Sequence, residues 1–251
     1  MKFQFKKITK IDVLLMSINP KYYPMFAFLL TAIIYLVNLS AIGVLGNGMN
    51  TINTSDLRQQ IIPYIFNFFD VLKGKHSFWY SWNFCLGSGG AGSYAYYAMS
   101  PFNIFYFLLG KNHLELASAL MIVSKASVAA MTFQFFIMYF LKNRYFETVL
   151  FSVMYGLCGF SVCYYLFVLL SDGFLIFPVI ILGILMLYRE NKIGILIFGY
   201  TYIFIVQFYI GYIVGLSSFI FFVVFYFYRI KSLSNKISIL FKYGFAVLIS
   251  L

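Results

Sequence analysis

The sequence predicts an all-α fold, a polytopic transmembrane helix bundle with an extracytoplasmic first loop that carries an amphipathic surface helix. Two observations predict this class. Hydrophobic residues make up 63% of the chain and charged residues only 10%, whereas soluble domains contain roughly 25% charged residues. The apolar residues form long uncharged runs, and most charged residues lie in the segments between them, as expected of transmembrane helices and their connecting loops.

The distribution of positive charge along the chain also indicates a membrane protein. The formal net charge is +11, from 18 Lys and Arg against 7 Asp and Glu. Such an excess also occurs in nucleic-acid-binding proteins. Because the basic residues here lie between apolar runs, they indicate orientation in a membrane instead. We therefore expect a multi-pass protein of the cell membrane that contacts membrane lipids and binds no nucleic acid.

The first span follows a basic N-terminal segment. Residues 1–21 contain five lysines and only one acidic residue, Asp12, and an uncharged apolar run follows at 22–45; the lysines are Lys2, Lys6, Lys7, Lys10 and Lys21. The run is longer than the roughly 7–15 apolar residues of a signal peptide. It predicts a transmembrane helix with a cytoplasmic N-terminus. The loop 46–113 is then outside.

Three further apolar runs predict spans at 114–141, 146–170 and 173–188, with a short outer turn at Ser171 and Asp172. The uncharged run 193–228 would be about 54 Å long as one helix, against a hydrocarbon core of roughly 30 Å.

We therefore expect spans at 193–208 and 211–228, with a turn near Gln207. This arrangement keeps every basic connector on the cytoplasmic side; these connectors hold Lys142, Arg144, Arg189, Lys192, Arg229, Lys231, Lys236 and Lys242. A last apolar run at 243–251 is too short to cross a membrane, which predicts that residues 1–251 are the N-terminal part of one longer membrane domain.

The first loop opens with an amphipathic pattern. Apolar residues recur every three to four positions from Leu57 to Leu72, which predicts a helix lying along the outer membrane surface. Ser55 is placed to cap its start and Gly74 to end it. Pro63 is expected to strain or kink it.

An aromatic and glycine-rich segment follows this helix, and it contains Phe78, Trp79, Tyr80, Trp82, Gly87, Gly89, Gly90, Gly92, Tyr94, Tyr96 and Tyr97. Two interpretations are open: an aromatic belt at the membrane interface, or a groove for a sugar or a lipid head group. Residues 87–92 match G-x-G-x-x-G, but we expect no strand before them and no clear helix after them, which excludes a dinucleotide site.

Three charged residues are candidates for function. Lys125 lies inside a span, where a charge costs about 2.5–3.5 kcal/mol, so it should face the bundle interior or a polar cavity. A purely structural lysine bonded to carbonyl groups is an equal alternative. Asp172 could simply be exposed at a turn, and Asp56 could simply favour a helix dipole. As two extracytoplasmic carboxylates near an aromatic loop, they also suggest acid–base or cation-binding chemistry.

Zinc binding is not expected, because the chain has two histidines, His76 and His113, and three cysteines without C-x-x-C spacing, Cys85, Cys158 and Cys163.

Several longer motifs resemble the bacterial YfhO membrane protein family. They are Ser55-Asp56-Leu57 with Gln60 and Pro63-Tyr64, Tyr80-Ser81-Trp82-Asn83 with Leu86-Gly87-Ser88, and Tyr94-Ala95-Tyr96-Tyr97 with Ser100-Pro101-Phe102-Asn103. Lys125, Asp172 with Pro178, and Phe208-Tyr209-Ile210-Gly211-Tyr212 are similar to further landmarks of the family. The resemblance covers nearly the whole chain. Ser171-Asp172-Gly173 departs from the family pattern, which has an aromatic residue and a leucine before the acid.

The resemblance implies a glycosyltransferase of the multi-spanning C-type superfamily. Its donor would be a polyprenyl-phosphate-linked sugar, its acceptor a cell-surface polymer such as lipoteichoic acid, and its reaction centre a first-loop aspartate outside the membrane. A lipid or solute transporter or flippase is the main alternative, with Lys125 and the interrupted run at 207–211 as pathway elements. A non-catalytic membrane assembly partner is another.

The resulting site hypothesis has two catalytic and nine substrate-binding residues. Asp56 and Asp172 are the catalytic candidates, and Asp56 would take a proton from the acceptor or hold a divalent cation. The substrate-binding candidates are Arg58, Gln60, Tyr80, Trp82, Asn83, Tyr96, Tyr97, Asn103 and Lys125. Arg58 and Lys125 would balance phosphate charge, and the aromatic rings would stack on sugars. Any cofactor other than this cation is left open.

Overall fold

The computed structural model describes residues 19–46, 50–84, 86–142, 145–165, 167–229 and 233–251. Of the residues named above, Lys2, Lys6, Lys7, Lys10, Asp12, Cys85, Arg144 and Lys231 lie outside this part of the chain. The regular secondary structure of the described chain is helical, except for one pair of two-residue strands. The predicted all-α membrane bundle is therefore confirmed.

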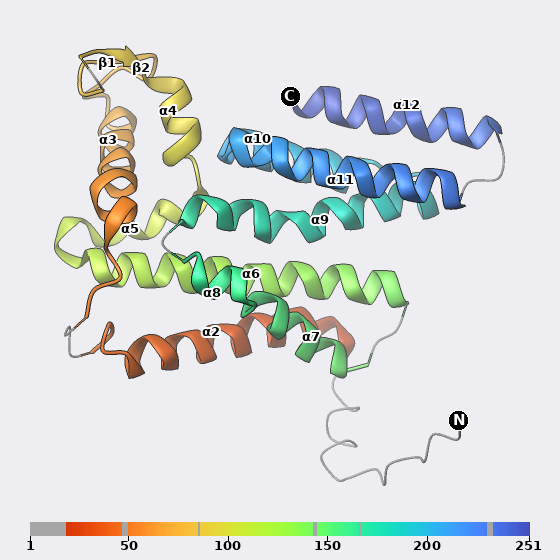
Figure 1. The fold of residues 1–251 in the computed structure, drawn as a ribbon, viewed down its shortest axis with the longest axis horizontal. Helices are drawn as coiled ribbons and strands as arrows, with labels where there is room; N and C mark the ends of the chain where they lie inside the picture. The colour runs from red at the N-terminus through yellow and green to blue at the C-terminus, as the bar shows by residue number, and fades with distance from the viewer. Residues whose placement is uncertain (1–18, 47–49, 85, 143–144, 166, 230–232) are drawn as a thin grey trace, which may run out of the picture.

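The bundle consists of roughly parallel and antiparallel helices that run horizontally in Figure 1. They are α2 (Tyr23–Ala41), α6 (Leu114–Leu141), α7 (Glu147–Gly156), α8 (Gly159–Cys163), α9 (Val168–Glu190), α10 (Gly194–Val206), α11 (Phe208–Arg229) and α12 (Leu233–Ser250). Of the helices described, four are long and apolar enough to cross a membrane, namely Pro20–Ala41, Lys111–Leu141, Val168–Glu190 and Phe208–Tyr228. Glu147–Cys163 and Gly194–Val206 are shorter apolar helices.

Small residues allow these helices to approach closely. The centre of the bundle is α6, which packs on α2, α7 and α9. A Cβ at Gly156 would lie 2.8 Å from the carbonyl oxygen of Ala126, and one at Gly183 would lie 2.7 Å from the backbone of Leu196. Close helix contacts through small residues are typical of membrane bundles, where apolar surface alone gives no driving force for association.

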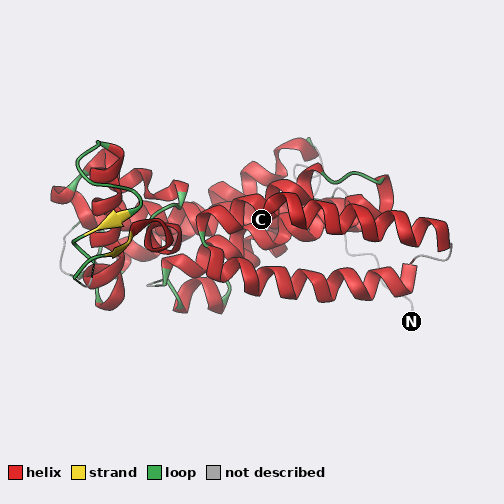
Figure 2. Cartoon of the chain, turned by 90° about the horizontal axis from the view of Figure 1, so that it is seen from above, coloured by secondary structure: helices red, strands yellow, loops and turns green. Residues whose placement is uncertain are grey.

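The first-loop module (residues 50–113) covers one end of the bundle. Its elements are the π-type turn η2 (Leu57–Ile61), α3 (Ile62–Leu72), β1 (Tyr80–Ser81), β2 (Ser88–Gly89), α4 (Gly90–Tyr97), α5 (Ile104–Leu109) and the 3₁₀ turns η3 (Pro101–Asn103) and η4 (Lys111–His113). Helix α3 stands across the axes of the bundle helices (Figure 1), and Figure 2 shows the whole module at one end of an elongated molecule.

Several sequence-based expectations agree with these bounds. Helix α6 occupies the predicted range 114–141. The long run 193–228 is interrupted at Gln207, which lies between α10 and α11. Gly74 follows the end of α3 with a φ of 75°, the left-handed conformation that a helix-ending glycine adopts.

The expected turn at Ser171 and Asp172 is wrong, because helix α9 already begins at Val168. The preceding run at 146–170 is not one helix either, since it divides into α7 and α8. From sequence alone, a charged residue between two apolar runs predicts a solvent-exposed turn. In the structure only 1% of Asp172 is exposed, so the charge is compensated inside the bundle.

A smaller expectation about the start of the first-loop helix is also wrong. Ser55 does not cap a helix, because its φ is 49° and the first turn after Asp56 has no side-chain cap. Pro63 lies in the first turn of α3, where proline is tolerated. The backbone irregularity expected at Pro63 is present directly before α3, as the π-type turn η2.

A strand pair and α4 surround the glycine cluster, so both features we did not expect there are present. Helix α12 begins ten positions before the apolar run, since its lysines are compatible with helical structure.

Candidate functional site

A buried ion pair joins the two central helices. The Nζ atom of Lys125, on α6, lies 2.6 Å from Oδ2 of Asp172, on α9. The exposed fractions of the two side chains are 2% and 1%. Lys125 also donates a hydrogen bond to the carbonyl oxygen of Val168 at 2.8 Å. The expected burial of Lys125 is confirmed, and the proposed solvent exposure of Asp172 is wrong.

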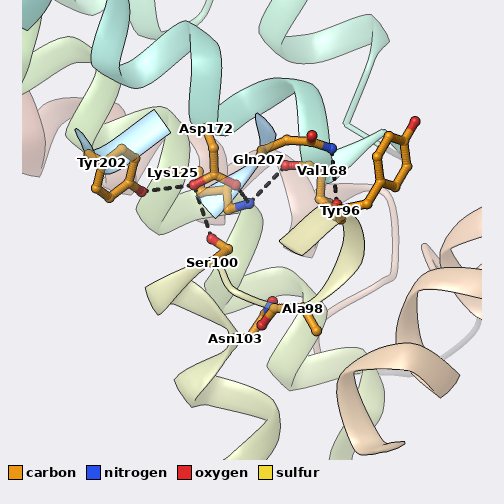
Figure 3. A network of polar contacts seen from close by, with 9 residues as sticks. All are labelled: Tyr96, Ala98, Ser100, Asn103, Lys125, Val168, Asp172, Tyr202 and Gln207. Atoms are coloured by element: carbon orange, nitrogen blue, oxygen red, sulfur yellow. Dashed lines mark hydrogen bonds and ion pairs between the residues drawn. The ribbon is translucent and has the colours of Figure 1, made fainter. Parts of the chain in front are cut away.

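The other oxygen of Asp172 receives two hydrogen bonds from different parts of the chain. Ser100, which precedes η3, donates at 3.0 Å, and Tyr202 on α10 donates at 2.9 Å (Figure 3). Buried charges are tolerated only when they are paired and hydrogen-bonded, and Asp172 meets both conditions. Through these contacts the ion pair connects four segments of the chain, namely α6, α9, α10 and the segment that contains Ser100.

A second contact fixes the same part of the first-loop module. Gln207, 1% exposed, donates a hydrogen bond from Nε2 to the carbonyl oxygen of Tyr96 at 3.0 Å. Asn103, 3% exposed, donates to the carbonyl oxygen of Ala98 at 2.9 Å. Residues 96–103 of the module are therefore held against the bundle (Figure 3).

An exposed acidic side chain lies on the module near an aromatic stack. Tyr97 stacks on Tyr64 with ring centroids 4.4 Å apart, and Tyr64 stacks on Phe84 at 4.8 Å. Burial raises the pKa of Tyr97 above its usual value, and the neighbouring Asp56 carboxylate adds to this rise, whereas a hydrogen bond from Gln60 lowers it. Both Asp56 and Gln60 are exposed. Asp56 and Gln60 therefore both contribute to the electrostatic environment of the Tyr97 hydroxyl.

The strand pair and its loop hold three more of the predicted residues. Tyr80 and Trp82 are 43% and 76% exposed, with ring centroids 5.2 Å apart, and Asn83 is exposed beside them. Gly87, with φ of 106°, closes the turn directly against these rings, because a Cβ there would overlap the hydroxyl group of Tyr80. Phe84, directly after the first strand and its turn, stacks on Tyr64 and so connects the hairpin to α3.

The predicted residues thus differ in burial. Asp56, Gln60 and the hairpin residues Tyr80, Trp82 and Asn83 are exposed, and Tyr96 and Tyr97 are half-buried. Lys125, Asp172 and Asn103 are buried. Arg58 is exposed on the first turn, and it forms no ion pair with any residue that the structure describes.

Comparison with known proteins decides the family. The model of the family described as "Bacterial membrane protein YfhO" matches residues 27–251. The chain belongs to the YfhO family. No curated protein and no solved structure matches it. In this YfhO protein every candidate site residue lies within the matched range.

The sequence did not single out Ser100, Tyr202 or Tyr64 as site residues. Ser100 belongs to a family motif, but nothing in its spacing indicates a partner 72 positions away. Tyr202 is one of several tyrosines in an apolar run, so only the fold distinguishes it. Gln207 was expected as a turn residue, and its bond to Tyr96 is new.

A divalent cation at Asp56 stays a prediction for this YfhO protein. Within the described ranges, no three His, Cys, Asp or Glu side chains come together in a group that could hold a metal ion. Cys158 and Cys163, which are free thiols, are not part of such a group. Asp56 alone could therefore offer one carboxylate ligand to a cation that is otherwise coordinated by substrate phosphate or water.

Proposed function

We propose that this chain carries the reaction centre of a glycosyltransferase that acts on the outer face of the membrane. The donor is a sugar on a polyprenyl-phosphate carrier, and the acceptor is a cell-surface polymer such as lipoteichoic acid. Membership of the YfhO family makes a glycosyltransferase role plausible. The observation that carries the proposal is that Asp56 is an exposed carboxylate of the first-loop module, directly before the turn that carries Arg58 and Gln60.

In the proposed reaction, Asp56 accepts the proton of an acceptor hydroxyl. The acceptor oxygen then forms a bond to the anomeric carbon of the donor sugar, and the bond from that carbon to the carrier phosphate breaks. The phosphate leaves with the electron pair, and Arg58, on the same exposed turn, balances its charge. Sugars could stack on the aromatic rings of Tyr96, Tyr97, Tyr80 and Trp82. Hydrogen bonds to sugar hydroxyls would come from the amide groups of Asn83 and Gln60. This reaction can proceed without a protein-bound metal.

Lys125 and Asp172 have a positioning role in this proposal. They are buried and satisfy each other, so neither is free to contact a phosphate or an acceptor in this arrangement. Asp172 instead holds Ser100, and Gln207 holds Tyr96. Together these contacts fix the position of α4, the helix that carries Tyr96 and Tyr97.

Transport of a lipid or solute is the second candidate function. It is favoured by the ionic pair inside the bundle and by the break between α10 and α11, because charges in membrane spans and interrupted helices often mark transport pathways. A non-catalytic assembly role is favoured by no specific contact among the described residues.

The experiment that separates these functions uses the full-length protein in liposomes, with the lipid-linked sugar donor placed in one leaflet. A transferase moves the labelled sugar to an added polymer when donor and acceptor lie on the side of the first-loop module, and it leaves the donor in its leaflet. Movement of intact donor between leaflets without sugar transfer would contradict the proposal and favour transport.

A further inference from the structure

A cavity of about 580 Å³ is formed where α6 and α9 end. Figure 1 shows these two helix ends at the end of the bundle remote from the first-loop module. Its lining consists of Phe135, Met138, Tyr139, Lys142, Arg189 and Glu190. None of these residues takes part in the proposed sugar transfer, so the cavity needs an explanation of its own.

The arginine in this cavity is held in place by the end of α6. Arg189 donates hydrogen bonds to the carbonyl oxygens of Tyr139 at 2.6 Å and Phe140 at 3.1 Å. Its guanidinium carbon also lies 5.0 Å from the centroid of the Tyr139 ring. These contacts use only part of the five N–H donors of an arginine. The remaining donors are fixed in orientation and can bind an anion.

The charges in the lining do not cancel. Glu190 is already engaged by Lys192 at 2.8 Å and by the hydroxyl of Tyr139 at 2.8 Å. Within the described chain, Lys142 and Arg189 form no ion pair. Lys142 lies at the C-terminal end of α6. The lining thus holds two cations and one carboxylate that is already paired, which favours an anionic ligand.

An apolar wall continues from these cations toward the middle of the bundle. Phe135 precedes Lys142 by seven positions, which corresponds to roughly 10 Å along a helix. Phe135 is 49% exposed, and the neighbouring Phe140 is 41% exposed. The helices that form the cavity are also long and apolar enough to cross a membrane. The cations therefore lie at the level expected for lipid head groups and the wall at the level of acyl chains.

We propose that this cavity binds one anionic phospholipid from the leaflet at that end of the bundle. The lipid phosphate contacts Lys142 and Arg189, and an acyl chain covers Phe135 and Met138. Basic pockets between transmembrane helices are known to select anionic head groups, with about 1 kcal/mol for each Lys or Arg near the surface. A free phosphate ion would satisfy the cations but would leave the apolar wall uncovered.

Native mass spectrometry of the purified full-length protein tests this proposal. The protein is titrated in neutral detergent with phosphatidylglycerol and, separately, with phosphatidylcholine. We expect tighter binding of phosphatidylglycerol. Lys142→Gln should weaken its binding about fivefold, since one charge is lost. Glu190→Gln should strengthen it by a similar factor, because a repelling carboxylate is removed and Lys192 is released. Misfolding could not produce this gain.

Lys75→Gln is the control, since Lys75 is an exposed lysine of the first-loop module, and its phosphatidylglycerol affinity should equal that of the parent. Equal affinities for the two lipids would overturn the proposal, as would unchanged binding in both cavity variants. Displacement of phosphatidylglycerol by millimolar inorganic phosphate would also overturn it and would indicate a site for soluble anions.

Discussion

Replacement of Lys125 by methionine should destabilise the protein strongly. Methionine has a similar length but no charge, so Asp172 would keep only its hydrogen bonds from Ser100 and Tyr202. Removing one partner of a buried ion pair typically costs about 3–5 kcal/mol, because the other charge is left uncompensated. We expect a loss of this size in the free energy of unfolding of the full-length protein, measured by denaturant titration in mixed micelles.

The double variant Lys125→Met and Asp172→Leu provides the decisive comparison. Because both charges are removed, most of the stability should return, apart from about 1–2 kcal/mol for the hydroxyl groups of Ser100 and Tyr202 that lose their acceptor. Lys192→Met is the matched control, since it breaks the partly exposed pair with Glu190 and should cost at most about 1 kcal/mol. The reasoning is refuted if Lys125→Met costs no more than this control, or if the double variant is as unstable as the single one.

Three further outcomes follow from the geometry. In a protein without native cysteines, Gly92→Cys should react with an impermeant thiol reagent added to intact cells and Lys192→Cys should not; the reverse pattern would show that the first-loop module faces the cytoplasm. Gly87→Ala should speed hydrogen exchange at the β1–β2 pair, because φ is 106° there and alanine at a positive φ costs more than about 1 kcal/mol; unchanged exchange would contradict this strain. Gln207→Leu should cost about 1 kcal/mol and speed exchange in residues 96–103, and exchange equal to the parent would mean that the bond to Tyr96 does not hold this segment.

The helices that could be predicted from sequence are those whose apolar run is too long for a single span or ends at charged residues. The uncharged run at 193–228 is too long for one span, so a break was required, and it occurs at Gln207. Helix α6 is bounded by basic residues on both sides, and Lys125 is the one charged residue between Glu115 in its first turn and its C-terminal end. In these places local composition alone determines the structure.

The elements that could not be predicted depend on contacts between distant residues. Asp172 lies inside a helix because Lys125, 47 positions earlier, compensates its charge. Without that partner in view, a carboxylate between apolar runs indicates a loop. The docking of residues 96–103 likewise depends on Asp172 and Gln207, which are 72 and 111 positions away from their partners.

The sequence predicts which part of the candidate site is exposed but not how the other part is paired. Asp56 and Gln60, named from the family motifs, are exposed on the first-loop module, and their role in a site stays a prediction. Lys125 and Asp172 were named for phosphate binding and catalysis, but the structure pairs them with each other. A single sequence gives no signal that separates a buried carboxylate with a structural partner from an accessible one.

The most direct test of the account is the rate of sugar transfer by the Asp56→Asn variant of the full-length protein. Asp56 makes no side-chain capping bond, so asparagine should change stability by less than about 0.5 kcal/mol. Loss of a general base lowers the rate by about a hundredfold or more. Asp70→Asn is the matched control, because Asp70 is a first-loop aspartate that pairs only with Lys75 at 3.1 Å.

The account predicts normal membrane insertion for both variants, a transfer rate at least about a hundredfold lower for Asp56→Asn, and a nearly unchanged rate for Asp70→Asn. Equal transfer rates for Asp56→Asn and the parent would contradict it.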